Sequence, residues 1–140
     1  MMAYRRTAYR VASHTLHIGQ QLKSWPFAQD DLILIGACNP GGKAQDEGRN
    51  RRAMADLQHR LSSMTSKPCL GNGAGHAVLQ GVGRWKRWCE PFFAVSIPVG
   101  KARGLGRLFG QNALVHVRRG QKARLIWLCD PKALPFREGR

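Results

Sequence analysis

Six polar residues have the types and the positions that a ligand-binding or catalytic site needs. Five of them stand where we expect a strand or a helix to begin or end, while Arg51 lies inside a predicted helix. Ligands tend to bind where element ends converge at one edge of a sheet. Two carboxylates beside amides and a guanidinium could transfer protons or simply hold a ligand. The ligand-site candidates are Asn39, Glu47, Arg51, Glu90, Gln111 and Asn112.

These residues also have a structural interpretation. Asn39 can cap a turn, and Glu47 can complement the positive end of a helix dipole. Gln111 and Asn112 can satisfy the last carbonyl groups of a helix. The sequence leaves both interpretations open, and it identifies no catalytic residue.

A second candidate site interleaves cations with aromatic rings. The segment Arg84–Trp88 reads Arg-Trp-Lys-Arg-Trp, a combination that suits single-stranded nucleic acid because cations contact phosphates and rings stack on bases. Alternatively, one tryptophan, with Trp88 the better anchor, fixes a loop to the core while the cations stay solvated. The nucleic-acid-binding candidates are Arg84, Trp85, Lys86, Arg87, Trp88, Arg118, Arg119, Lys122 and Arg124.

The charge balance favours a polyanionic partner. The 140 residues contain 23 Lys and Arg against eight Asp and Glu, which gives a formal net charge of +15. Such a field attracts nucleic acid and other polyanions. We therefore expect the protein to bind RNA or DNA, or a nucleic-acid–protein assembly. The alternatives are an enzyme or a sensor that takes a small anionic ligand at the six polar residues, and an interaction protein that docks on an acidic partner.

Cysteine and histidine give no sign of a metal or another cofactor, and we expect neither. The four cysteines are far apart, without the CxxC pairs of zinc sites, and the five histidines form no HxxxH motif. Cys38 could be a nucleophile, but a buried thiol at the end of a strand is the favoured interpretation. No segment reaches the roughly 18 apolar residues of a membrane span, and the N-terminus lacks the apolar core of a signal peptide. We expect a cytoplasmic protein.

Hydrophobic patterning predicts the elements that position these residues. Residues 32–38 are apolar on both faces, as in a central strand. Helical spacing of apolar residues predicts a helix over 46–64. A second helix is predicted over 101–111, with Leu105 and Leu108 on its apolar side. Further strands are expected at 8–12, 15–18, 92–97, 114–117 and 124–128, and the glycine-rich residues 71–83 predict a loop or a loosely paired ribbon.

This succession predicts an α+β fold with a single domain over residues 1–140, of which about 130–140 form a loop-like tail. A mainly antiparallel sheet carries the two helices on one face, and a ferredoxin-like core would fit its middle part. If the surroundings of Cys69 contribute a strand, the order of elements is β-β-β-α-β-β-α-β-β.

Five segments carry a resemblance to a known family. They are Tyr9–Val11, Ala37–Pro40, Glu47, Trp88–Pro91 and Phe109–Ala113, of which the last is the most specific. Through them the chain, over about residues 4–127, resembles the bacterial domain-of-unknown-function family 3293. That family usually has Asn after the glutamate that matches Glu47, and Ser two residues after the glutamate that matches Glu90. Gly48 and Phe92 stand at those positions here. The resemblance implies a small bacterial protein of about one domain and brings no activity with it.

Overall fold

Strand β3 (Asp31–Ile35) carries apolar side chains on both faces and lies inside the sheet. Its side chains alternate between two buried clusters, with Leu34 in one and Ile35 in the other. It is hydrogen-bonded on one side to β5 (Trp88–Val95) and on the other to β6 (Ala113–Arg118), both antiparallel. The predicted central strand is therefore confirmed, although it ends before residue 38.

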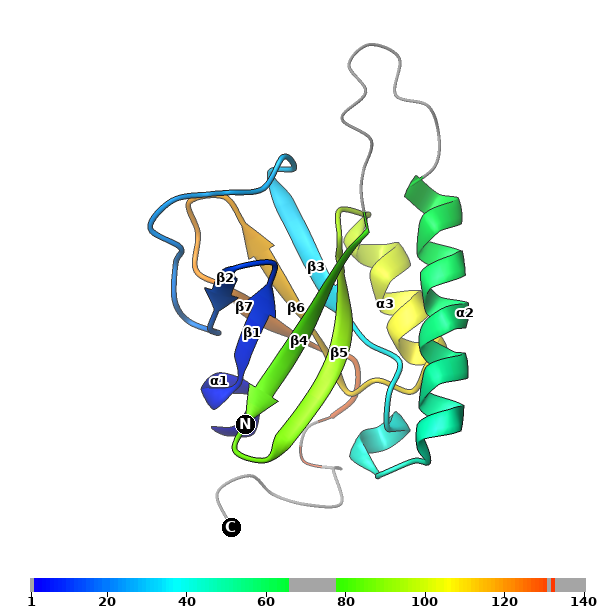
Figure 1. Cartoon of the computed structure of the whole chain (residues 1–140). Helices are drawn as coiled ribbons and strands as arrows, with labels where there is room; N and C mark the ends of the chain where they lie inside the picture. The colour runs from blue at the N-terminus through cyan, green and yellow to red at the C-terminus, as the bar shows by residue number, and fades with distance from the viewer. Residues whose placement is uncertain (1, 66–77, 131, 133–140) are drawn as a thin grey trace.

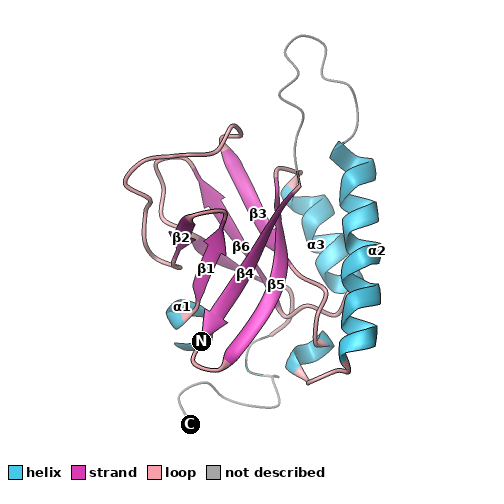
Figure 2. Cartoon of the chain, viewed as in Figure 1, coloured by secondary structure: helices cyan, strands magenta, loops and turns pink. Residues whose placement is uncertain are grey.

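Seven strands form one antiparallel sheet in the order β2-β1-β4-β5-β3-β6-β7 (Figures 1 and 2). The structure is a computed structural model that describes residues 2–65, 78–130 and 132. Within these ranges no helix combines the length and the apolar character that a membrane span requires. The strands not yet named are β1 (Ala8–Val11), β2 (His14–Leu16), β4 (Leu79–Trp85) and β7 (Arg124–Trp127).

The four inner strands have the ferredoxin-like topology. Helix α2 (Glu47–Thr65) connects β3 to β4, and α3 (Val99–Leu108) connects β5 to β6. The resulting βαββαβ unit has the strand order β4-β5-β3-β6. Both helices lie on one face of the sheet (Figure 2). The prediction of an α+β fold with two helices on one face is confirmed. Two short elements, α1 (Met2–Arg6) and the 3-10 turn η1 (Pro40–Gly42), complete the described part of the chain.

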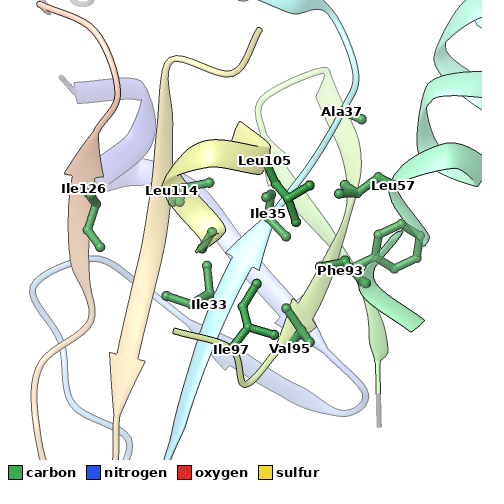
Figure 3. Packing of buried hydrophobic residues seen from close by; sticks show 12 residues of the cluster. Ile33, Ile35, Ala37, Leu57, Phe93, Val95, Ile97, Leu105, Leu114 and Ile126 are labelled. Atoms are coloured by element: carbon green, nitrogen blue, oxygen red, sulfur yellow. The ribbon is translucent and has the colours of Figure 1, made fainter. Parts of the chain in front are cut away.

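The helix side of the sheet holds one buried cluster. Leu57 of α2 and Leu105 of α3 pack there against Ile35 and Phe93 of the sheet (Figure 3). Leu61 of α2 belongs to the same cluster. The helix predicted over 46–64 agrees with α2 to within a residue at each end, and its apolar positions include those that face the sheet.

Helix α3 ends earlier than the sequence predicts. Its last residue is Leu108, whose side chain is 60% exposed rather than on the apolar side. Gly110 adopts the left-handed backbone conformation (φ 67°), and the amide of Gln111 donates to the carbonyl oxygen of Gly106 at 2.8 Å. Because this pattern of bonds closes a helix, Gln111 lies in the loop that follows α3.

The other face of the sheet is concave and encloses the second cluster. The segment after β2 is hydrogen-bonded to Ala123, the residue before β7. The amide of Gly19 donates to the carbonyl oxygen of Ala123 (2.7 Å), and the amide of Ala123 donates to the carbonyl oxygen of Gln20 (3.0 Å). The two edges of the sheet therefore approach each other. The enclosed residues are Tyr9, Val11, Leu16, Phe27, Leu32, Leu34, Phe92, Ala94, Val115, Val117 and Ala123.

Strand β4 shows that, of the two alternatives predicted for residues 71–83, the paired ribbon holds over the part from residue 79 onward. It pairs with both β1 and β5, and β5 begins at Trp88, before the predicted residue 92. Gly81 pairs with Phe92 across the ribbon. A Cβ at Gly81 would overlap the Phe92 ring and would lie 2.6 Å from the carbonyl oxygen of Arg10. Glycine therefore stands there because the concave face has no room for a side chain. The strand expected near Cys69 lies outside the described residues.

We expect Gly81→Ala to destabilise the fold by about 1–3 kcal/mol, because the added methyl group must displace a ring and a backbone carbonyl. Gly104→Ala is the matched control. Gly104 lies in α3 with nothing within 4 Å of an added Cβ, so alanine should stabilise the fold by about 1 kcal/mol. Urea denaturation of both variants measures the difference. Equal effects would contradict the steric argument.

Candidate functional site

The topology brings several predicted residues to one end of the sheet. β5 and β6 run antiparallel to β3, so both begin where β3 ends. Asn39 follows β3, Glu90 lies near the start of β5, and Gln111 and Asn112 immediately precede β6. The structure thus places these four residues together, while Glu47 and Arg51 lie apart from them on α2.

Asn39 connects the end of β3 to the start of α2 and to Glu90 of β5. It adopts the left-handed conformation (φ 49°, ψ 63°), which asparagine tolerates better than most residues. Its Nδ2 donates to Oε1 of Glu90 at 2.6 Å. Its Oδ1 accepts from the amide of Gln45 (2.9 Å) and from Nδ2 of Asn50 (3.0 Å), while its own amide donates to Asn50 Oδ1 (3.0 Å). The Asn39 side chain therefore joins Gln45 and Asn50 to the carboxylate, and it makes no capping hydrogen bond at η1.

Gln111 fixes the loop between α3 and β6 to the end of β3. Its Nε2 donates to the carbonyl oxygens of Cys38 (3.1 Å) and Phe109 (3.2 Å). The amide of Gly41 donates to the oxygen of Gly110 at 2.7 Å, which joins the same two loops a second time. By its bond to Phe109, Gln111 also satisfies a carbonyl group at the end of α3, as the structural interpretation of this residue predicts.

A cavity of about 330 Å³ opens at this end of the concave face. Among the described residues, its lining includes aromatic rings, side-chain amides and one carboxylate, that of Glu90. Trp85 and Trp88, which the sequence assigned to a different candidate site, line this same cavity. The lining residues used below are Tyr4, Tyr9, Cys38, Asn39, Trp85, Trp88, Glu90, Phe92, Gln111 and Asn112; we call this cavity the Glu90 pocket.

Glu90 is the charged residue of the pocket. Burial raises the pKa of its carboxyl group above the ordinary value of 4.5, while hydrogen bonds from the side chains of Asn39 and Trp88 lower it, with a net rise. Among the described residues that line the pocket, none is Lys or Arg. The interior is therefore suited to groups that donate hydrogen bonds, and poorly suited to an anion.

Tyr4, Tyr9 and Asn50 belong to the site although the sequence did not point to them. Burial, together with the negative charge of Glu90, raises the pKa of the Tyr4 phenol. Asn112 lowers that pKa by a hydrogen bond to the phenol. Tyr9 packs edge-on against Phe92, with ring centroids 6.0 Å apart. The N-terminal segment has no motif that would predict this placement, because only strand pairing brings it to the pocket.

Cys38 is a buried thiol in the wall of the pocket. Burial, with a contribution from the charge of Glu90, raises its pKa to about 11. The thiol is therefore protonated at neutral pH and is a weak nucleophile. This favours the structural interpretation of Cys38. Among the described residues, no group of three or more His, Cys, Asp or Glu side chains is arranged to hold a metal ion.

Glu47 and Arg51 line a shallower groove between α2 and the β4–β5 ribbon. Both side chains are exposed. The groove touches the Glu90 pocket at Cys38, Asn39 and Glu90, which line both. The six ligand-site candidates thus divide into four at the pocket and two on the helix beside it.

The predicted basic residues divide between the two ends of the sheet. Lys86 and Arg87 form the turn of the β4–β5 hairpin at the pocket end, and Lys86 Nζ lies 4.6 Å from the Trp85 ring centroid. Arg84 lies between two residues that line the pocket, so strand alternation directs its side chain to the other face. The cations at the opposite end of the strands, around the β6–β7 turn, are Arg118, Arg119, Lys122 and Arg124.

Part of the charge at that opposite end is already engaged. Arg119 forms an ion pair with Asp30 at 3.1 Å, and Arg124 contacts Nδ1 of His116 at 3.4 Å. In the described part of the chain, Lys86 and Arg87 form no ion pair within 4.0 Å. Arg118 and Lys122 at the opposite end likewise form no ion pair among the described residues, so both ends of the sheet offer uncompensated positive charge.

The fold and the pocket define an α+β protein with a ferredoxin-like core and a polar pocket at one end of its sheet. The chain belongs to the family described as "Protein of unknown function (DUF3293)", whose model matches residues 35–114. That range, more than half of the chain, is narrower than the resemblance over about 4–127, and it contains all six ligand-site candidates. No curated protein and no solved structure gives a significant match.

We expect the stability of the protein to depend on pH through Glu90. A carboxyl group whose pKa is raised by folding stabilises the fold fully below its ordinary pKa, and this contribution is lost as the pH rises through the raised pKa. The free energy of unfolding of the wild type should therefore fall relative to that of Glu90→Gln as the pH rises from below 4.5 through the raised pKa of Glu90. Urea denaturation across this range measures it. Parallel pH profiles would show that burial of the carboxyl group has no net effect.

Proposed function

We propose that the protein binds single-stranded nucleic acid at the pocket end of the sheet. The observation that carries the proposal is the hairpin tip Trp85–Trp88, where two tryptophans at the pocket flank two exposed cations. Trp88 is 44% exposed, so a large part of this residue is accessible to a stacking partner. Phosphates would contact the cations and unstacked bases would contact the rings.

Further cations support the same location. Arg5 and Arg6 are exposed in α1, between Tyr4 and Thr7, which line the pocket. With Lys86 and Arg87 they make four cations near the pocket, which we call the rim cations. The excess of 15 positive charges in the whole chain would add long-range attraction for a polyanion. We propose a cytoplasmic protein whose target is RNA or DNA in single-stranded form.

A small ligand at the Glu90 pocket is the second candidate function, favoured by the enclosed volume and by the network around Asn39. The lining offers no Lys or Arg among the described residues, so the ligand would be neutral or cationic rather than the anion expected from the sequence. The two functions are compatible, because the tryptophans belong to both sites.

We expect the double variant Lys86→Gln and Arg87→Gln to weaken binding to short single-stranded RNA or DNA. Each phosphate contact on a single strand contributes about 0.7 to the slope of log affinity against log salt, so losing two contacts should reduce the slope by about 1.4. Fluorescence anisotropy over a salt series measures affinity and slope together.

Two further double variants lose the same charge elsewhere. Lys101→Gln with Arg103→Gln removes two exposed cations from α3, and Arg118→Gln with Lys122→Gln removes two from the far end of the sheet. Both should retain most of the affinity. An equal loss in all three would mean that net charge alone attracts the strand. Absence of wild-type binding at low salt would overturn the proposal and turn attention to an acidic protein partner.

A further inference from the structure

Charge is distributed oppositely inside and outside the Glu90 pocket. Inside, Glu90 is the charged side chain, and the remaining lining among the described residues is aromatic, aliphatic or amide. Outside, the rim cations Arg5, Arg6, Lys86 and Arg87 are all exposed. A ligand that satisfies both zones has an uncharged part that donates hydrogen bonds and, beside it, an anionic part.

Neither a small anion nor a small cation complements both the Glu90 carboxylate inside the pocket and the rim cations outside it. A free anion would meet the Glu90 carboxylate in the pocket, with no lining Lys or Arg among the described residues to pair with it. A polyamine would suit the carboxylate but would be repelled by the rim cations and by the net charge of +15. A nucleotide has the required division, since its base is uncharged and its phosphate is anionic.

The pocket also has the dimensions and the walls for a base. Its volume of about 330 Å³ lies at the small end of ligand pockets, which suits one heterocycle rather than a longer segment. Tyr4, Tyr9, Trp85, Trp88 and Phe92 supply aromatic walls. Gly83 contributes to the space, because a Cβ there would lie 3.4 Å from Thr7 and 3.5 Å from Tyr9.

We infer that the Glu90 pocket receives one unstacked base of the bound strand, with its hydrogen-bonding edge toward Glu90 and its phosphates at the rim cations, and that the preferred base is guanine. This inference rests on the proposed function and deepens it. The rim cations determine how tightly a strand binds, whereas the pocket determines which base enters.

The preference for guanine follows from the hydrogen-bond groups of the bases. Guanine presents two adjacent N–H donors on its Watson–Crick edge, while adenine and cytosine present an amino group beside a ring acceptor, and uracil presents one N–H between two carbonyl oxygens. An ionised carboxylate only accepts hydrogen bonds and has about four lone-pair sites. Asn39 and Trp88 supply two donors to Glu90, so a base with two adjacent donors can complete the set.

The test compares nucleotide monophosphates and single-stranded oligouridylates that carry one central guanine, adenine or cytosine. Isothermal titration of the wild-type protein should show GMP bound about tenfold more tightly than AMP, CMP or UMP, since a bidentate base contact is worth about 1–3 kcal/mol. In Glu90→Gln the side-chain amide replaces one acceptor by a donor, and the preference for guanine should fall by about tenfold. Glu47→Gln is the matched control, because it removes the same charge from an exposed position outside the pocket.

Each outcome separates the two proposals. Tight binding of oligonucleotides without a base preference, or an unchanged preference in Glu90→Gln, would overturn the assignment of the pocket and leave the proposed function standing. Preference for GMP in a protein that binds no oligonucleotide would overturn the proposed function and retain the pocket assignment. If Glu90→Gln fails to fold, the ranking of the four monophosphates on the wild type still decides the matter.

Discussion

The short hydrogen bond between Asn39 and Glu90 joins the connections on which the pocket depends. Through Asn39 the carboxylate is linked to Asn50 and so to the start of α2, while Gln111 ties the loop after α3 to the same strand end. The Glu90 side chain is thus held by Asn39, which is itself held by Gln45 and Asn50. A binding group held in this way loses little conformational freedom when a ligand arrives, which favours affinity.

The sequence predicts well those elements whose signal is local. β3 is apolar on both faces and α2 has apolar residues at helical spacing, so each could be predicted without knowledge of its neighbours. For β4 the sequence leaves a loop and a loosely paired ribbon open, because the concave face of this strand carries glycines where an apolar residue would be expected. The reason is the Phe92 ring on β5, which occupies the space that a side chain at Gly81 would need. Because the constraint comes from a side chain on β5, the sequence of β4 alone does not reveal it.

The candidate site shows the same division. Asn39, Glu90, Gln111 and Asn112 could be predicted as a group because each stands at an element end, and the antiparallel neighbours of β3 bring those ends together. Glu47 also stands at an element start, but that element is α2, a helix in the second layer, so Glu47 and Arg51 line a groove outside the pocket. Tyr4 and Tyr9 reach the pocket only through the pairing of β1 with β4, which sequence patterning does not reveal.

The charges inside and outside the pocket are energetically connected. Burial disfavours the ionised form of Glu90, whereas the hydrogen bonds from Asn39 and Trp88 favour it. In the proposed complex, phosphates at the rim cations bring further negative charge close to this carboxylate and disfavour its ionised form. Hydrogen-bond donors on the base that enters with the phosphates act in the opposite direction, because they favour the ionised form. A base with two adjacent donors is therefore the one that can keep the carboxylate ionised while the phosphates lie beside it.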